Sequence, residues 1–121
     1  AALEAVCFQS PELLECIQRD SSIKVNQLHV DGGASVSKLL LRIQASQMQC
    51  EIVRPQNLET TSFGAAALAA LGVGLWTKEE ISTVWKEDMR FSPEPWSDRL
   101  KTERHYWDSA VERTKLWKKE V

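Results

Sequence analysis

A buried strand that ends abruptly in two adjacent glycines constrains this chain more than any other feature of its sequence. Residues 28–35 read Leu-His-Val-Asp-Gly-Gly-Ala-Ser, which predicts a strand, a tight turn and the start of a helix. Two glycines let the backbone of such a turn come close to a ligand, because no Cβ stands in the way. Amides at the following helix start would suit an anion such as a phosphate. A Gly-Gly pair is also typical of an ordinary tight turn, so both interpretations stay open.

A second stretch, residues 59–66, repeats this pattern of polar turn, glycine and small residues. It opens a predicted helix over about 61–72, on which Gly64, Ala67 and Leu71 share one narrow face. We expect that face to pack tightly against another helix or the sheet. The longest apolar run of the chain, residues 63–76, is shorter than the roughly 20 residues that a membrane span needs. We therefore expect a buried helix and no membrane span.

The rest of the chain alternates between helix and strand. Periodicity and turn residues predict helices over about 2–19, 35–47 and 98–119, strands over 25–30 and 51–54, a short helix starting at Thr77, and a loop or extended stretch over 86–95. This alternation indicates an α/β layer architecture. Two short strands make a poor sheet, so further strands are expected in preceding chain. The length of 121 residues suits about one domain.

Several residues predict where these helices begin. Pro11 either kinks one long first helix or opens a second segment after Ser10, and we favour the kink. Ser35 is the expected N-cap of the second helix, and Ser97 that of the last. Thr77 and Glu80 have the spacing of a capping box.

Charge and cysteine content limit the classes of function. The net charge of −2 gives no broad electrostatic footprint for nucleic acid. Cys7 and Cys16 lie about 13 Å apart along one predicted helix, too far for a disulfide. With Cys50 they form an odd set without a Cys-x-x-Cys pair, which indicates reduced, buried thiols and a cytosolic setting.

Aromatic and titratable residues invite functional interpretations that we weigh against structural ones. The five tryptophans are read as anchors that pin the C-terminal third onto the body, since acidic residues interleaved with the basic ones argue against a base-stacking platform. They are Trp76, Trp85, Trp96, Trp107 and Trp117.

Two polar residues at the end of the first strand favour structural roles. His29 is expected to face solvent or a helix, because no carboxylate or nucleophile lies at a telling spacing. Asp31 is expected to terminate the strand or to hydrogen-bond the turn rather than to act in catalysis.

Several motifs together resemble one family. They are residues 28–35, 39–45 (Leu-Leu-Leu-Arg-Ile-Gln-Ala), 53–55 (Val-Arg-Pro), 59–66, 73–76 and the helix around 105–117. In this order and register, over nearly the whole chain, they resemble the C-terminal domain of the FGGY carbohydrate kinases. Within that family the resemblance is strongest to the kinases that act on glycerol.

The resemblance implies an α/β fold of the ribonuclease H-like, actin-type ATPase class, with two such domains around a cleft. Residues 1–121 would be the C-terminal, ATP-binding domain, truncated at its N-terminal side and rich in helices. The implied activity is ATP- and Mg²⁺-dependent phosphorylation of a polyol in the cytoplasm. Mg²⁺, the glycerol or related polyol and the catalytic aspartate would belong mainly to upstream chain. This chain would therefore be inactive alone; a homo-oligomer is possible.

The resemblance also implies three nucleotide-binding residues and no catalytic or metal-binding ones in this chain. The family's Gly-Gly turn approaches the nucleotide and falls on Gly32 and Gly33, with Gly33 the better candidate. An asparagine that contacts the adenine side is replaced by Ser37, which lacks the two-sided amide pattern. Contact with adenine would then be weakened or routed through water. Ser46 replaces a frequent aspartate.

Two alternatives remain beside a glycerol-type kinase. One is a kinase for another sugar, since the substrate contacts would lie outside this chain. The other is a degenerate lobe without catalytic function that serves as an interaction or regulatory domain. Ser37 and Lys38 favour the degenerate lobe, whereas the intact glycine turn argues against it. Nucleotide affinity separates these alternatives.

Overall fold

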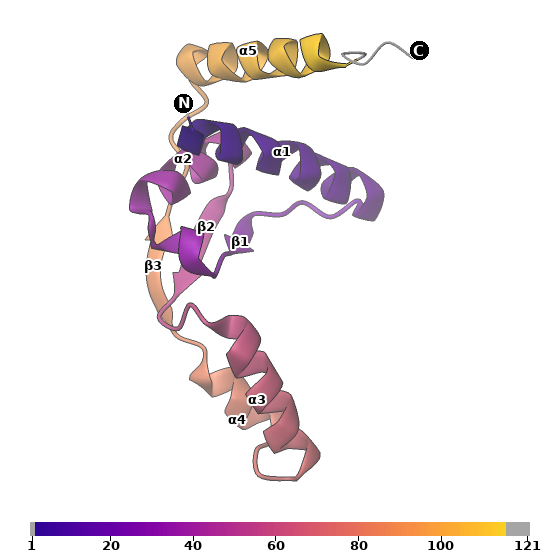
Figure 1. Ribbon diagram of the computed structural model, residues 1–121, viewed down its shortest axis with the longest axis vertical. Helices are drawn as coiled ribbons and strands as arrows, with labels where there is room; N and C mark the ends of the chain where they lie inside the picture. The colour runs from indigo at the N-terminus through magenta and orange to yellow at the C-terminus, as the bar shows by residue number, and fades with distance from the viewer. Residues whose placement is uncertain (1, 116–121) are drawn as a thin grey trace.

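The structure is a computed structural model that describes residues 2–115 and contains a small sheet with helices beside it and beyond both of its ends (Figure 1). The elements in chain order are α1 (Ala2–Ser21), β1 (Gln27–His29), the 3₁₀ helix η1 (Gly33–Val36), α2 (Lys38–Met48), β2 (Glu51–Pro55), α3 (Thr60–Gly72), α4 (Lys78–Val84), β3 (Glu87–Phe91) and α5 (Asp98–Thr114). The predicted α/β organisation is therefore present. Residues 116–119 of the predicted last helix lie outside the described residues.

The sheet has the strand order β1-β2-β3. β1 and β2 are parallel, with Leu28 opposite Ile52, whereas β2 and β3 are antiparallel, with Ile52 opposite Phe91. The expectation of only two strands in this chain was wrong, because β3 forms where a loop or extended stretch was predicted. Met89 and Phe91 alternate there with charged residues, which is typical of a strand with one covered face.

The hydrophobic core lies between α1, α2 and the sheet, which together we call the body. Leu41, Ile52 and Cys7 are almost fully buried there. α1 runs unbroken through Pro11, as the prediction of one long helix required. The core cluster consists of Cys7, Leu40, Leu41, Ala45, Ile52 and Phe91.

Three predicted caps have different outcomes. The capping box of Thr77 and Glu80 is confirmed, and the Ser97 hydroxyl accepts a hydrogen bond from the Leu100 amide. Ser35 is not the N-cap of α2, because it lies within η1, buried, and its hydroxyl donates to the Gly32 carbonyl at 2.6 Å. Ser37 caps α2 instead.

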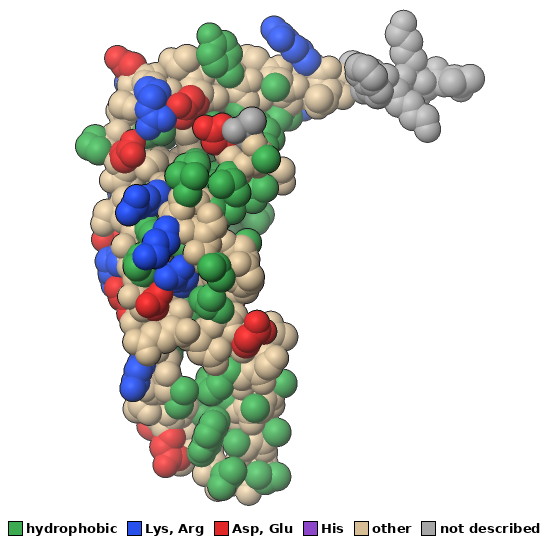
Figure 2. Space-filling view, turned by 60° about the vertical axis from the view of Figure 1, so that its left-hand side comes forward, with side chains coloured by type: hydrophobic (Ala, Val, Ile, Leu, Met, Phe, Trp, Pro, Cys, Tyr) green, Lys and Arg blue, Asp and Glu red, His purple; other side chains and the backbone are tan. Residues whose placement is uncertain are grey.

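Helices α3 and α4 project from the opposite end of the sheet to α5, and we call this pair the arm (Figure 1). Only Ala67 and Ala70 are buried on α3. A Cβ at Gly64 would meet no atom of the described residues within 4 Å, outside its own helix. The predicted face is the covered side of α3, with Ala67 buried and Gly64 and Leu71 half-buried, but its packing within residues 2–115 is not tight at Gly64. Apolar side chains gather on the surface of the arm, in the lower part of Figure 2.

The cysteine and tryptophan predictions are confirmed in part. All three cysteines are free, and Cys7 and Cys50 are buried, but Cys16 is exposed on the outer side of α1. Trp107 stacks on Phe8 with ring centroids 5.5 Å apart, which joins α5 to α1 as expected.

The other tryptophans contribute less to that anchoring. Trp76 packs against Phe63 within the arm, and Trp96 stays 41% exposed. Trp117 lies outside the described residues. Within the described part of the chain, we find no helix whose length and apolar character would let it cross a membrane.

Candidate functional site at the ends of two parallel strands

The two stretches singled out in the sequence meet at one edge of the sheet. β1 and β2 are parallel, so their carboxyl ends lie side by side, and the Val30 amide donates to the Val53 carbonyl at 3.0 Å. The glycine turn follows β1, and the connection to α3 follows β2. In open α/β sheets, ligands bind in the crevice outside the carboxyl ends of the strands. This edge is therefore the candidate site.

Hydrogen bonds fasten the glycine turn to the start of α3. The Gly32 amide donates to the Leu58 carbonyl at 3.1 Å, and the Thr60 hydroxyl donates to the Asp31 carboxylate. Asp31 thus bonds the first residue of α3 rather than its own turn. The Asn57 side chain accepts from the Glu59 amide at 3.0 Å, which shapes the connection.

Gly32 and Gly33 differ in what requires a glycine. Gly32 has φ 77° and ψ 176°, a backbone conformation that residues other than glycine essentially never adopt. Gly33 has no positive φ, and a Cβ there would meet no atom of the described residues within 4 Å. Neither backbone strain nor packing within residues 2–115 therefore requires glycine at position 33.

Ser37, the third predicted site residue, lies at the junction of η1 and α2. Its hydroxyl oxygen accepts from the Leu40 amide at 3.3 Å, and its own amide donates to the Ala34 carbonyl. A hydroxyl that accepts one hydrogen bond still has a proton to donate. Ser37 can therefore cap α2 and offer a donor to a ligand at the same time.

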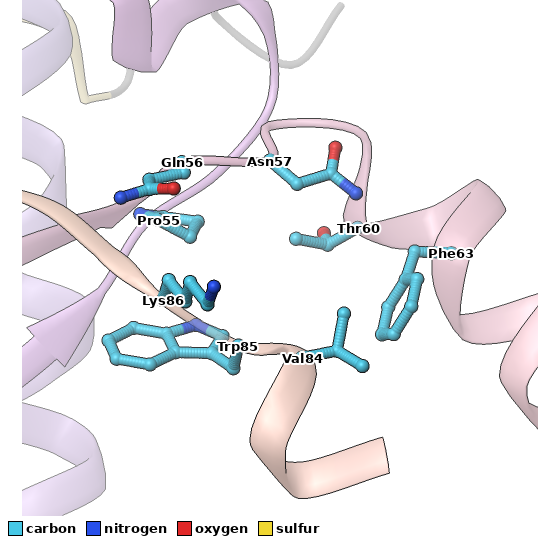
Figure 3. Close-up of a pocket in the computed structure, with 8 residues that line it drawn as sticks. All are labelled: Pro55, Gln56, Asn57, Thr60, Phe63, Val84, Trp85 and Lys86. Atoms are coloured by element: carbon cyan, nitrogen blue, oxygen red, sulfur yellow. The ribbon is translucent and has the colours of Figure 1, made fainter. Parts of the chain in front are cut away.

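A pocket of about 160 Å³ opens between the end of β2 and the arm (Figure 3). It is lined by Pro55, Gln56, Asn57, Thr60, Phe63, Val84, Trp85 and Lys86. Aromatic rings, amides and one ammonium group suit a small, partly apolar group with polar edges. Typical ligand pockets enclose about 300–1,000 Å³, so this pocket alone is too small for a nucleotide.

Trp85 connects this pocket to β1. Its ring stacks on His29 with centroids 4.7 Å apart. His29 is exposed, as expected, and the contact with Trp85 is the part that the sequence did not predict. Nearby, hydrogen bonds from the Arg90 guanidinium lower the pKa of the Glu87 carboxyl.

Behind the glycine turn lies a buried charge that the sequence analysis missed. Arg54 is 8% exposed on β2, and its Nε donates to the Asp88 carboxylate at 2.9 Å. The signal was present as an arginine directly after the apolar pair Ile52 and Val53. Asp88 had no such signal, because its stretch was not recognised as a strand.

The described residues offer no metal site of their own. Residues 2–115 contain no group of three or more His, Cys, Asp or Glu side chains that could hold a metal ion.

Comparison with known proteins identifies the family. The model of the FGGY family of carbohydrate kinases, C-terminal domain, matches residues 1–73. The chain belongs to this family. Glycerol kinase from Deinococcus radiodurans is 43% identical over 118 residues, which make up 97% of this chain and 24% of that enzyme. A glycerol kinase from Saccharolobus islandicus is 41% identical over 122 residues, covering 100% of this chain and 24% of the enzyme. The resemblance read from the sequence is confirmed.

Solved structures of FGGY kinases share the fold. Plasmodium falciparum glycerol kinase with ADP superimposes with a TM-score of 0.78 at 28% identity, over 96% of this chain and 24% of that one. Gluconate kinase from Lactobacillus acidophilus gives a TM-score of 0.77 at 17% identity, over 97% and 24% of the two chains, and this likeness concerns the fold alone. The chain thus spans about a quarter of the length of these relatives.

Proposed function

We propose that this chain is the nucleotide-binding, C-terminal part of an ATP-dependent kinase that phosphorylates glycerol or a related polyol. The observation that carries the proposal is the place of Gly33, which follows the carboxyl end of β1 beside parallel β2 and which neither φ nor packing within the described residues requires to be glycine. A glycine of that kind is suited to close approach by a ligand. The ligand here is ATP or ADP, with Gly32 shaping the turn and Ser37 donating from the start of α2.

The surroundings support a nucleotide at this edge. The turn lies at the carboxyl ends of parallel strands, where nucleotides bind in other α/β sheets. The relatives at about 40% identity are glycerol kinases, and one related structure contains ADP.

The chemistry of transfer requires more than these residues. Phosphoryl transfer depends on positioning, on metal ions that neutralise charge, and on a residue that accepts the substrate hydroxyl proton. The carboxylate of Asp31 is engaged by Thr60, and no metal cluster occurs within residues 2–115. We infer that Mg²⁺, the polyol and the proton acceptor are bound by the rest of a longer cytoplasmic enzyme, and that this chain does not turn over substrate alone.

Replacing Gly33 tests the proposal most directly. In the intact kinase, Gly33→Val should weaken binding of Mg-ADP at least tenfold, because the added side chain would occupy the approach to the turn. The melting temperature should change little, because Gly33 has no positive φ and a Cβ there has room within residues 2–115. Gly72→Val, at the exposed end of α3, is the matched control and should leave affinity unchanged. Calorimetric titration measures both variants, and a folded Gly33→Val protein with native affinity would refute the assignment.

A degenerate, non-catalytic lobe is the second candidate, and Ser37 favours it. A serine used as a helix cap has replaced the amide that the family resemblance leads one to expect. The unmodified intact protein decides between the two. Binding of Mg-ADP together with glycerol phosphorylation supports the kinase, whereas failure to bind millimolar Mg-ADP would leave only the degenerate lobe. Phosphorylation of a different sugar alone would identify another FGGY activity.

A further inference from the structure

Arg54 connects three parts of the molecule around the candidate site. Its Nε and Nη2 both donate to the Asp88 carboxylate on β3. Its Nη1 donates to the Ser35 carbonyl at 3.0 Å and to the Val36 carbonyl at 3.3 Å. One side chain on β2 therefore holds β3 and η1 together.

Burial makes these contacts necessary rather than incidental. A charged group removed from water is costly unless it is paired and hydrogen-bonded. The Arg54 guanidinium meets that requirement with one carboxylate and two carbonyls. Those carbonyls lie at the C-terminal end of η1, where a helix leaves acceptors without intrahelical partners. Arg54 supplies their hydrogen-bond donor. The pairing of charge and acceptors thus fixes where η1 ends and α2 begins.

The residues that η1 carries are the proposed nucleotide contacts. Gly33 is its first residue and Ser37 its C-cap. At the other end, the Ser35 hydroxyl donates to the Gly32 carbonyl and closes the turn. We propose that Arg54, oriented by Asp88, is a positioning residue that holds η1 so that Gly33 and Ser37 meet the nucleotide. This inference rests on the proposed function.

The geometry assigns Arg54 to positioning rather than to contact with the nucleotide. Its side chain is 10% exposed, and Nε, Nη1 and Nη2 all donate to protein acceptors. A nucleotide outside the turn would meet the backbone of η1 first. Arg54 acts through that backbone.

Steady-state kinetics of the intact kinase test this role. Arg54→Met removes both sets of contacts, and the KM for ATP should rise roughly tenfold or more, with a smaller change in kcat, because a small displacement of a binding element costs binding geometry. Arg54→Lys keeps the charge but not the fork that reaches Asp88 and the carbonyls together, and should restore part of the affinity. Asp88→Asn should give an intermediate KM.

Arg90→Met is the matched control. Arg90 lies on β3 next to Met89 and pairs with Glu51 and Glu87, but its side chain is 41% exposed and makes no hydrogen bond to η1 within residues 2–115. Its replacement removes ion pairs from the same sheet without removing a bond to η1. The KM for ATP should therefore not change. An equal rise in KM for Arg54→Met and Arg90→Met would overturn the inference, because it would reduce the effect to general loosening of the sheet.

A second readout separates failure of this inference from failure of the proposed function. Hydrogen exchange at the Ser37 amide, which donates to the Ala34 carbonyl, reports on η1 without any nucleotide. In Arg54→Met, faster exchange of the Ser37 amide together with an unchanged KM for ATP would overturn the positioning role while leaving the nucleotide site intact. An unmodified protein that does not bind ATP would overturn the proposed function and this inference with it.

Ser35→Ala covers the case in which Arg54→Met does not fold. This variant removes the bond from the Ser35 hydroxyl to the Gly32 carbonyl without changing charge. It should raise both the KM for ATP and the exchange rate of η1 in a folded protein. Faster exchange in Ser35→Ala together with an unchanged KM for ATP would show that the position of η1 does not govern binding.

Discussion

The body and the arm differ in what their helices cover, although α3 of the arm is more apolar than α2 of the body. In α2 of the body, Leu40, Leu41 and Ala45 lie buried against α1 and the sheet. In α3 of the arm, small residues of the helix itself occupy all of its sides, and Leu68 stays 71% exposed. Beyond α3, Val73 and Leu75 are exposed as well. The arm thus has the composition of a core helix but not its packing.

This difference shows that apolar composition alone does not place a helix in a core. A helix is held by a stripe of large side chains that meets a partner surface, and α2 has such a stripe. The arm is held to the sheet by fewer contacts, including the bond between Thr60 and Asp31 and the stack of Trp85 on His29. We expect substitutions in the body to affect global unfolding and those in the arm to act locally.

Truncating one leucine in each region should give the largest contrast. Leu41→Ala should lower the free energy of unfolding by about 2–5 kcal/mol, because it leaves a cavity among fully buried neighbours. Leu68→Ala, its counterpart in the arm, should change it by less than about 0.5 kcal/mol. Guanidinium denaturation of the chain measures both. A loss of more than about 1 kcal/mol for Leu68→Ala would place the arm inside the cooperative core.

The sequence predicted the extent of α3 in the arm as closely as the helices of the body, but it did not predict how α3 packs. In the body, periodic large side chains, caps and turn residues all indicate the same elements, and α1, α2 and β2 lie close to their predicted positions. The path of α3 depends on tertiary partners, which local periodicity does not contain. β3 was missed because Glu87, Asp88 and Arg90 hid the alternation of Met89 and Phe91.

Helix caps offer a second, smaller contrast. Ser37→Ala should destabilise the chain by about 1 kcal/mol, because α2 loses the acceptor for the Leu40 amide and belongs to the body. Thr77→Ala removes the equivalent cap from α4 in the arm. It should lower helicity by circular dichroism while leaving the denaturation midpoint nearly unchanged. Equal midpoint shifts for both variants would contradict separate behaviour of the two regions.

The candidate site could be predicted only in part. Gly32 and Gly33 were found because a strand followed by two glycines has a local meaning. Ser37 was chosen through the family resemblance, and its role as a cap became visible only with the turn in place. Arg54 and Asp88 lie on different strands, and their pairing depends on the register of β2 with β3. No local pattern carries that information.

The thiols of the body provide the third and smallest contrast, since the arm contains no cysteine. Burial raises the pKa of the Cys7 and Cys50 thiols above their ordinary value. A raised pKa in the folded state contributes stability that is present below the unfolded pKa, about 8.5, and is lost as pH rises through the folded value. The free energy of unfolding should therefore fall slightly as pH rises from about 8.5.

A double variant, Cys7→Ala with Cys50→Ala, isolates this dependence from other groups that titrate at alkaline pH. Its slope of unfolding free energy against pH should be flatter than that of the unmodified chain, because both buried thiols with a raised pKa are absent. Thiol labelling gives an independent check, with Cys16 reacting first and the two buried thiols reacting only as the body opens. If Cys7 and Cys50 react as fast as Cys16 while the chain stays folded, then the body opens as readily as we expect of the arm, and the contrast between the two regions fails.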